Sequence, residues 1–188
     1  MPVFIRPPTA EQLTALVSEQ GALPYSYPEV GASRRSFPAG YDHDRSCILL
    51  GKGESVFAAA REALDQWRMF DTGWVQVYPK PASTEAGTVV AVVFRLFGLY
   101  WCNACRIAYP IREAGSHGFA YGTLKDHVER GEERFFVRRD TDGRVWYHIE
   151  AFSRPGHWLT WLGYPLARAF QRRFVRDSGA AMQAEIGR

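Results

Sequence analysis

The spacing of apolar residues divides most of the chain into one helix followed by a long succession of strands. Phe57, Ala60 and Leu64 recur at intervals of three and four residues, which predicts an amphipathic helix over residues 54–70. The apolar run at residues 45–51 precedes this helix and is typical of a buried strand. Alternation of apolar and polar residues after the helix predicts six further strands, over residues 74–78, 88–97, 100–111, 117–124, 132–139 and 144–153.

The two ends of the chain have other patterns. Near the N-terminus, Thr9 can cap a short helix over residues 10–19, and a segment rich in Pro, Gly and aromatic residues continues to residue 44. Its aromatic residues indicate an ordered loop that lies on the body of the protein. Near the C-terminus, Pro165 suits the first position of a long helix over residues 165–183.

One face of the predicted C-terminal helix is apolar and another is basic. Leu166, Phe170 and Phe174 recur every four residues, so we expect them to be buried against the sheet. Three further residues lie about 200° around the helix from this stripe and should remain in water. They are Arg168, Arg172 and Arg176.

The order of the predicted elements defines a fold class. Short turns such as Asp142-Gly143 join the strands, and no helices alternate with them, so the sheet should be antiparallel. We therefore expect an α+β, helix-grip fold, in which a curved antiparallel sheet of about seven strands wraps around the long C-terminal helix. A closed barrel or a sandwich is the alternative. One domain should cover residues 1–188, with the N-terminal helix and loop in residues 1–44 and the helix-grip body in residues 45–188.

Composition excludes several classes of protein. Hydrophobic residues make up 46% of the 188 residues and charged residues 23%, so a disordered chain is excluded. The longest aliphatic and aromatic run, residues 89–94, is far shorter than the roughly 20 residues that cross a bilayer, so we expect no membrane span. The net charge of +3 gives no reason to expect a nucleic-acid partner. Aromatic residues, at 14%, are abundant enough to line an apolar pocket.

The N-terminal sequence and the cysteines indicate a compartment. MPVFIRPPTAEQ contains two prolines and no long apolar stretch, so it does not resemble a signal peptide. The three cysteines are an odd number, which a purely intrachain disulfide framework would leave unbalanced. Both observations favour a reducing, cytoplasmic location.

Several longer motifs carry a family resemblance. They are FAYGTLKDHVERGEERF at residues 119–135, VWYHI at 145–149, FSRP at 152–155 and GYP at 163–165. With YSYPEVG, LGKGESVFAAAREALDQW and GTVVAVVF earlier in the chain, they resemble the uncharacterised DUF1990 family of bacteria and plants. The resemblance implies the START-like, or Bet v 1-like, helix-grip superfamily (SRPBCC). It implies no reaction, ligand or catalytic residue, and Asp126 stands where the family pattern has a glycine before His127.

Motifs for metals, cofactors and nucleophiles are incomplete. Cys102 and Cys105 have the spacing of half a zinc site, but no second pair exists and residues three apart on a strand point to opposite faces. The GKGE sequence at residues 51–54 lacks the remainder of a phosphate-binding loop, and no GxSxG motif is present. We therefore expect no metal and no cofactor.

Polar and aromatic residues on three predicted strands are the candidates for a ligand site. Residues two apart share a strand face, so these side chains can converge on one cavity if the faces point inward. Amphipathic alternation alone places the apolar residues of the last strand inward, and an error of one residue would leave Gly122, Leu124, Tyr147 and Ile149 facing the interior. The candidate ligand-binding residues are Tyr121, Thr123, Glu133, His148, Glu150 and Arg154, with Trp101 and Trp146 as apolar walls.

Three functions are compatible with these patterns. The first is binding of a hydrophobic or lipid-like small molecule in a cavity between the sheet and the C-terminal helix. The second is an enzyme of cyclase, hydrolase or isomerase type on the same scaffold, with an inward carboxylate or histidine as acid and base. The third is a structural or interaction domain whose interior is filled by side chains. A large cavity would favour the first two.

Overall fold

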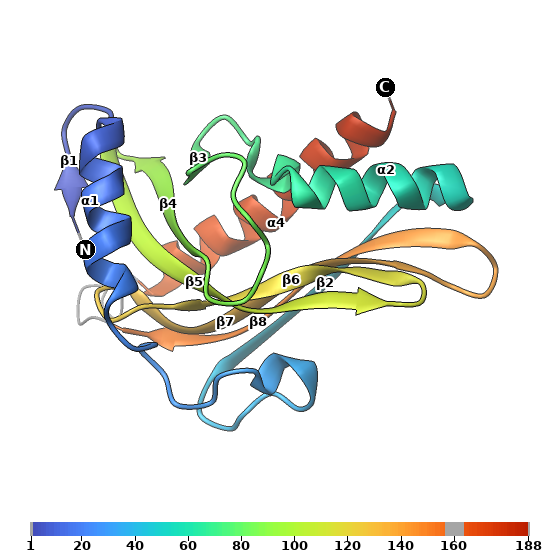
Figure 1. Ribbon diagram of the computed structural model, residues 1–188, viewed down its shortest axis with the longest axis horizontal. Helices are drawn as coiled ribbons and strands as arrows, with labels where there is room; N and C mark the ends of the chain where they lie inside the picture. Colours follow the sequence, from blue (N-terminus) through green and yellow to red (C-terminus); the bar gives the residue numbers. More distant parts are fainter. Residues whose placement is uncertain (1, 157–163, 188) are drawn as a thin grey trace.

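The sheet is the central element of the fold (Figure 1). The computed structural model describes residues 2–156 and 164–187. Antiparallel strands form one sheet in the order β2-β8-β7-β6-β5-β4-β3, and β1 pairs with β5 outside this path. The strands are β1 (Val3–Phe4), β2 (Asp42–Lys52), β3 (Val75–Tyr78), β4 (Val89–Leu96), β5 (Leu99–Glu113), β6 (Ser116–Thr123), β7 (Glu129–Arg139) and β8 (Arg144–Pro155).

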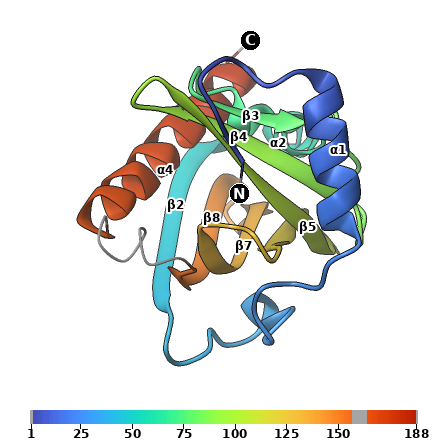
Figure 2. The ribbon, with the colours of Figure 1, turned by 90° about the vertical axis from the view of Figure 1, so that its left-hand side faces the viewer.

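The sheet is curved and open. In Figure 2 the strands curve from β2 on one side to β4 and β5 on the other. β2 and β3 are the two end strands and do not pair with each other, so the barrel alternative is wrong. The pairing register shifts between Ile107 and Tyr109, and such a bulge bends a strand. Gly131 also allows a close approach of β7 to β8, because a Cβ atom there would lie 1.9 Å from the carbonyl oxygen of Phe152.

The helical elements follow the predicted order, with one interruption. They are α1 (Ala10–Gly21), η1 (Ala32–Arg34), α2 (Glu54–Asp65), η2 (Arg68–Phe70) and α4 (Tyr164–Ile186). The helix predicted over residues 54–70 stops early because Trp67 adopts a left-handed conformation, with φ of 58°. This turn inserts the Trp67 side chain into the core, where its indole N–H donates to the carbonyl oxygen of Ala82 at 2.9 Å.

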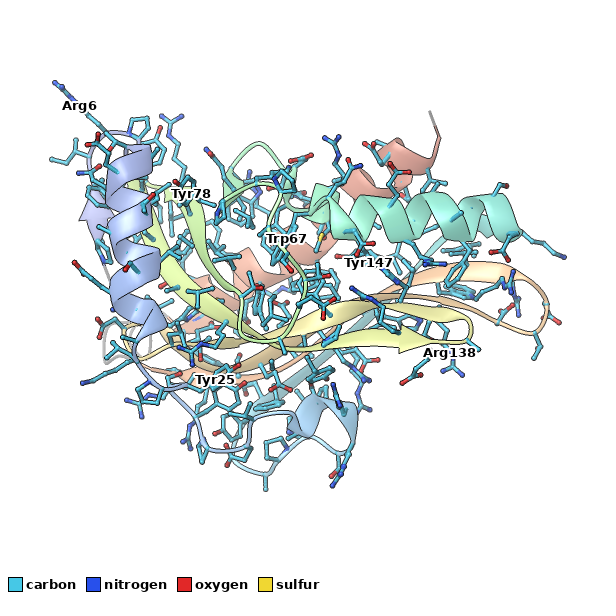
Figure 3. The ribbon with its side chains drawn as sticks, in the orientation of Figure 1. Arg6, Tyr25, Trp67, Tyr78, Arg138 and Tyr147 are labelled. Atoms are coloured by element: carbon cyan, nitrogen blue, oxygen red, sulfur yellow. The ribbon has the colours of Figure 1, made fainter. Side chains whose placement is uncertain are left out.

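One end of the concave face is filled by side chains from the sheet, α2, η2 and the C-terminal half of α4. Figure 3 shows Trp67 and Tyr147 between α2 and the sheet. Gly179 of α4 lies so close to Ile48 that a Cβ atom would come within 2.4 Å of the Ile48 Cδ1 atom. The large, fully buried side chains of this filled end are Leu64, Trp67, Phe70, Phe119, Phe135 and Tyr147.

The N-terminal half of α4 is less buried than its sequence pattern predicts. Leu166 is 45% exposed, and Phe170 and Phe174 are only partly buried. The reason is that these residues border a cavity, although Phe174 also contacts Phe135 of β7 at the edge of the core. Arg168 also departs from the prediction: its guanidinium is paired with Asp44 of β2. Arg172 and Arg176 are exposed, as expected.

The N-terminal region covers the outside of the sheet. The Thr9 side chain caps α1 as predicted, and α1 packs through Leu13 and Leu16 on the outer face of β4 and β5. Residues 25–41 then cross the convex face of β7 and β8, on the opposite side from α2 and α4 (Figure 1). Glu132 anchors this segment, because its carboxylate accepts hydrogen bonds from the Tyr27 hydroxyl at 2.8 Å and the Gly31 N–H at 2.7 Å.

Candidate functional site

A cavity of about 1010 Å³ lies between the concave face of the sheet and the N-terminal half of α4. Its volume is at the upper end of the range, roughly 300–1,000 Å³, that is typical of small-molecule sites. Six aromatic side chains provide much of its apolar wall. They come from η2, the residue before β3, β4, β5 and α4, and are Phe70, Trp74, Phe94, Trp101, Phe170 and Phe174.

Small inward-facing residues create the open space. Ala151 of β8 pairs in register with Glu133 of β7, and Ser153 pairs with Gly131. These residues occupy the same concave face as Ile149 and Phe135, which contribute to the packed core. Since Gly, Ala and Ser cannot fill the distance to α4, the concave face is hollow at this end.

Glu133 is the most distinctive polar group in the cavity. Tyr121 is its cross-strand neighbour on β6 and donates its hydroxyl hydrogen bond to the Glu133 Oε2 atom at 2.9 Å. Among the described residues, no hydrogen bond to the other oxygen, Oε1, is present. Burial raises the pKa of Glu133 to about 8, and the nearby charge of Glu129 raises it further, whereas the Tyr121 hydrogen bond opposes the shift. The carboxyl group is therefore predominantly protonated at neutral pH.

A second set of polar contacts joins the sheet to α4 at the same cavity. Gln171 donates from Nε2 to the Glu129 Oε1 atom at 2.7 Å, and Arg168 pairs with Asp44 through both terminal nitrogens. Burial raises the pKa of Glu129, while the Gln171 hydrogen bond and the Arg168 charge lower it. Both contacts cross the cavity wall from β2 or β7 to α4, so they hold the helix at a distance from the sheet.

His127 also lines the cavity but is unsuited to carry a positive charge. Burial lowers its pKa to about 4, and the backbone N–H of Glu129 donates to its Nδ1 atom at 3.0 Å. The ring is thus a neutral hydrogen-bond acceptor at neutral pH. The pKa of Glu133, at about 8, lies closer to neutral pH than that of His127.

The structure brings half of the predicted ligand-binding residues to the cavity. Tyr121, Thr123, Glu133 and Trp101 all line it. Thr123 is committed to local structure as well, because its hydroxyl group contacts the Ser26 hydroxyl at 2.6 Å and accepts from the Gly131 N–H at 3.0 Å. Trp101 stacks on Phe94 with a centroid separation of 6.2 Å and forms an apolar wall, as expected.

The other four predicted residues lie on the convex face, so the expected convergence of the two strand faces is wrong for β8. His148 stacks on Phe136 at 4.5 Å, and the Arg154 guanidinium lies over the Tyr41 ring at 4.6 Å. On the same face, Glu150 pairs with Arg134, and the Trp146 indole donates to Asp140 at 3.2 Å. The cause is the pleat: Tyr147 and Ile149 enter the core, so their neighbours must point outward.

Three cavity residues were missed by the sequence reasoning. Glu129 was placed in a loop, because the predicted strand began at residue 132 instead of 129. Gln171 and Asp44 lie far from Glu129 in the chain: Gln171 reaches it through the docking of α4, and Asp44 through the pairing of β2 with β8. For Glu129 a signal was available, since it lies four residues before Glu133 and therefore on the same face once the strand is extended.

The cysteines do not form a metal site. Cys102 packs with α1 on the outer face of the sheet, and Cys105 lies in the main core, so the two side chains point to opposite faces as expected. All three cysteines are free. Burial raises the pKa of the Cys102 thiol to about 11, which makes it a poor ligand and nucleophile. Within residues 2–156 and 164–187, no group of three or more potential ligands is placed to hold a metal ion.

Comparison with solved structures defines the class of fold. Human STARD10 aligns with a TM-score of 0.52 at 10% identity, covering 94% of this chain and 80% of that one. Ara h 8.0201 aligns with a TM-score of 0.50 at 11% identity, covering 77% and 99%. At such low identity these likenesses establish the fold alone. The protein therefore has the START-like and Bet v 1-like helix-grip fold, as the sequence resemblance implied.

Sequence comparison then identifies the family. The model of the family described as "Domain of unknown function (DUF1990)" matches residues 26–181. A UPF0548 protein of Dictyostelium discoideum is 42% identical over 159 residues, which cover 78% of this chain and 74% of the relative. A UPF0548 protein of Deinococcus radiodurans is 34% identical over 184 residues, which cover 92% and 93%. The chain belongs to the DUF1990 family, and none of these descriptions assigns a function.

Proposed function

We propose that this protein binds a hydrophobic or lipid-like small molecule in the cavity between the sheet and α4. The observation that carries the proposal is the cavity itself: about 1010 Å³ of space beside six aromatic side chains. Removal of apolar surface from water would supply most of the binding free energy. The pair formed by Tyr121 and Glu133 would orient the ligand through one polar group.

The cavity also bears on the third function considered above, a domain with a filled interior. The filled end of the sheet shows that this chain can pack its concave face completely with Phe, Trp and Tyr side chains. At the other end, contacts between polar residues of α4 and the sheet hold the helix over small residues. This arrangement supports a binding site over a purely structural scaffold.

The test is to fill the cavity from the sheet side. Ala151→Leu would place a larger apolar side chain beside Glu133, and we expect it to weaken the binding of decanol, an uncharged apolar probe, by about tenfold or more in a calorimetric titration. Glu150→Gln, on the convex face, is the matched control and should leave binding unchanged. Equal affinity in wild type and Ala151→Leu would refute the location of the site.

A second candidate function, acid–base catalysis, is favoured by one observation. A carboxyl group with a pKa of about 8 beside a tyrosine can both donate and accept a proton near neutral pH. Mass spectrometry of molecules that co-purify with wild type and with Glu133→Gln tests this candidate. An enzyme would accumulate a precursor in the variant, whereas a binding protein would retain the same molecule in both.

A cytoplasmic location belongs to the same proposal. It is supported by the three free cysteines, of which Cys47 is exposed. Among the described residues, no helix is sufficiently long and apolar to cross a membrane. Fractionation of cells that express the tagged protein would test the location.

A further inference from the structure

The interior of the cavity has a surplus of acidic groups. Asp44, Glu129 and Glu133 all line it, and each contributes to the electrostatic environment of the others. Arg168 is the cation paired with this set, and both of its terminal nitrogens are engaged by Asp44. A ligand that enters the cavity therefore meets Glu133, which has no ion pair among the described residues, and Glu129, whose pKa stays raised despite the nearby charge of Arg168.

The remaining basic residues of the lining do not change this balance. Lys125 and Arg172 are exposed to solvent. The Arg45 guanidinium lies over the ring of Phe37, which belongs to the segment on the convex face. None of these three has a described ion pair with Glu129 or Glu133. Among the described residues, Glu133 therefore has no ion pair with a cationic side chain, whereas the charge of Arg168 acts on Glu129.

The hydrogen bonds of the acidic residues distinguish one of them. Asp44 is satisfied by Arg168, and Glu129 accepts from Gln171. Among the described residues, Glu133 accepts a hydrogen bond from Tyr121 only, through Oε2, and none of them donates to its Oε1 atom. Glu129 lies four residues along the same strand face, about 13 Å away at roughly 3.3 Å per residue, and therefore does not compete for the same ligand atom.

We propose that the ligand is a cationic amphiphile, whose apolar body fills the aromatic part of the cavity and whose protonated amine binds the Glu133 carboxylate. The inference rests on the proposed binding function and names its ligand class. An ammonium group donates up to three hydrogen bonds, so it can use the Oε1 atom, to which no described residue donates. A fatty-acid anion would find no cationic partner at Glu133, and the nearby charge of Glu129 would oppose its binding.

The protonation of Glu133 provides an independent readout. The titratable groups that face it are Tyr121 from β6, Tyr147 from β8, Cys105 from β5, Glu129 from β7 and Asp44 from β2. Burial keeps Glu133 predominantly protonated at pH 7, with a pKa of about 8. A bound ammonium group would lower that pKa, so amine binding should release close to one proton, and alcohol binding none.

The experiment compares three probes with one apolar chain: decylamine, decanol and decanoate. Calorimetric titration at pH 7, in two buffers of different ionisation enthalpy, gives both the affinity and the protons released. We expect decylamine to bind about tenfold more tightly than decanol, and decanoate to bind most weakly. Glu133→Gln should abolish the amine preference and the proton release, so that decylamine binds no more tightly than decanol. Glu150→Gln, on the opposite face, should behave as wild type.

The outcomes separate this inference from the proposed function. Decanol binding that Ala151→Leu abolishes, without a preference for decylamine, would overturn the ligand class and leave the apolar site in place. An amine preference that persists in Glu133→Gln would overturn the assignment to Glu133. Absence of binding of all three probes would refute the proposed function and this inference together.

Discussion

The two ends of the concave face of the sheet differ in the size of the side chains that they present. At one end Phe119, Phe135 and Tyr147 are fully buried beneath α2 and η2. At the other end the same strands β7 and β8 present Gly131 and Ala151 beneath α4. The backbone pairing is continuous across both ends, so the strands do not change and only the inward side chains do.

One sheet can thus contribute a closely packed core at one end and a cavity for a ligand at the other. Close packing at the filled end buries large aromatic groups, and aromatic contacts such as Trp67 on Phe119 at 4.5 Å strengthen it. At the hollow end this burial of large aromatic groups is absent. Instead, Glu133 lies there with its carboxyl group protonated, whereas in bulk water the group would be ionised at neutral pH. Each substitution below should therefore have a different effect on the free energy of unfolding at the two ends.

The largest effect is expected for Phe135→Ala, at the centre of the filled end. Phe135 is fully buried and its ring contacts Phe70 and Phe119 at centroid separations of 5.5 and 5.8 Å. Truncation should lower the free energy of unfolding by about 3–5 kcal/mol, measured by urea denaturation. A loss below about 1 kcal/mol would show that this end is not closely packed.

Enlarging a small residue should sharpen the contrast. Ala60→Leu adds volume in α2 at the filled end, where Ala60 is fully buried, and should cost about 1–3 kcal/mol. Ala151→Leu adds the same volume at the hollow end, where the cavity accepts it, and should change stability by less than about 1 kcal/mol. Thermal unfolding of both variants makes the comparison, and equal losses would contradict it.

A pH dependence is expected from Glu133. Its pKa is raised from 4.5 to about 8 on folding, so the native state binds more protons than the unfolded chain between these values. The contribution of this group to stability is therefore largest below about pH 4.5 and decreases as pH rises to 8. Glu133→Gln should be more stable than wild type by about 4 kcal/mol at pH 8, with little difference at pH 4.5.

Urea denaturation of wild type and Glu133→Gln at several pH values measures that dependence. Glu150→Gln is a control on the convex face, where removal of the Arg134 ion pair should give no such change between pH 4.5 and 8. Parallel curves for wild type and Glu133→Gln would mean that Glu133 is ionised in the native protein at neutral pH.

The smallest effect is expected for Phe170→Ala. Phe170 is only partly buried at the cavity. Its ring centroid lies 6.1 Å from that of Trp74 and 6.2 Å from that of Phe97. Its truncation should cost about 1 kcal/mol, because part of the ring is already in water. The variant should lose more free energy of decanol binding than free energy of unfolding. A loss as large as that of Phe135→Ala would show that α4 packs equally tightly along its length.

The element order was predictable because local patterns carry it. Apolar residues at every second position predict β8, and apolar residues at intervals of three and four predict α2. Neither pattern depends on contacts with distant parts of the chain. The capping box at Thr9 and the Asp142-Gly143 turn are likewise local signals. The order of elements predicted the helix-grip fold, with a barrel or a sandwich as the alternative, and the motif resemblance implied the same fold.

The facing of the candidate residues could not be predicted with the same certainty. Alternation along β8 offers two faces with aromatic residues, Tyr147 on one and Trp146 and Phe152 on the other. Phe152 is buried on the convex side because Tyr27, Phe37 and Tyr41 cover it. Burial of an aromatic residue therefore did not identify the concave face, since the N-terminal segment buries the convex one.

The sequence by itself determined the strands, the helices, the antiparallel pairing and the family, because each depends on residues close together in the chain or on a contiguous motif. Only the tertiary structure decided that Glu133 and Tyr121 face the cavity while His148 and Glu150 face away. It also decided that Gln171 reaches Glu129. The physical reason is that sheet curvature and helix docking fix the distance between layers, and that distance is set by packing between residues far apart in the sequence.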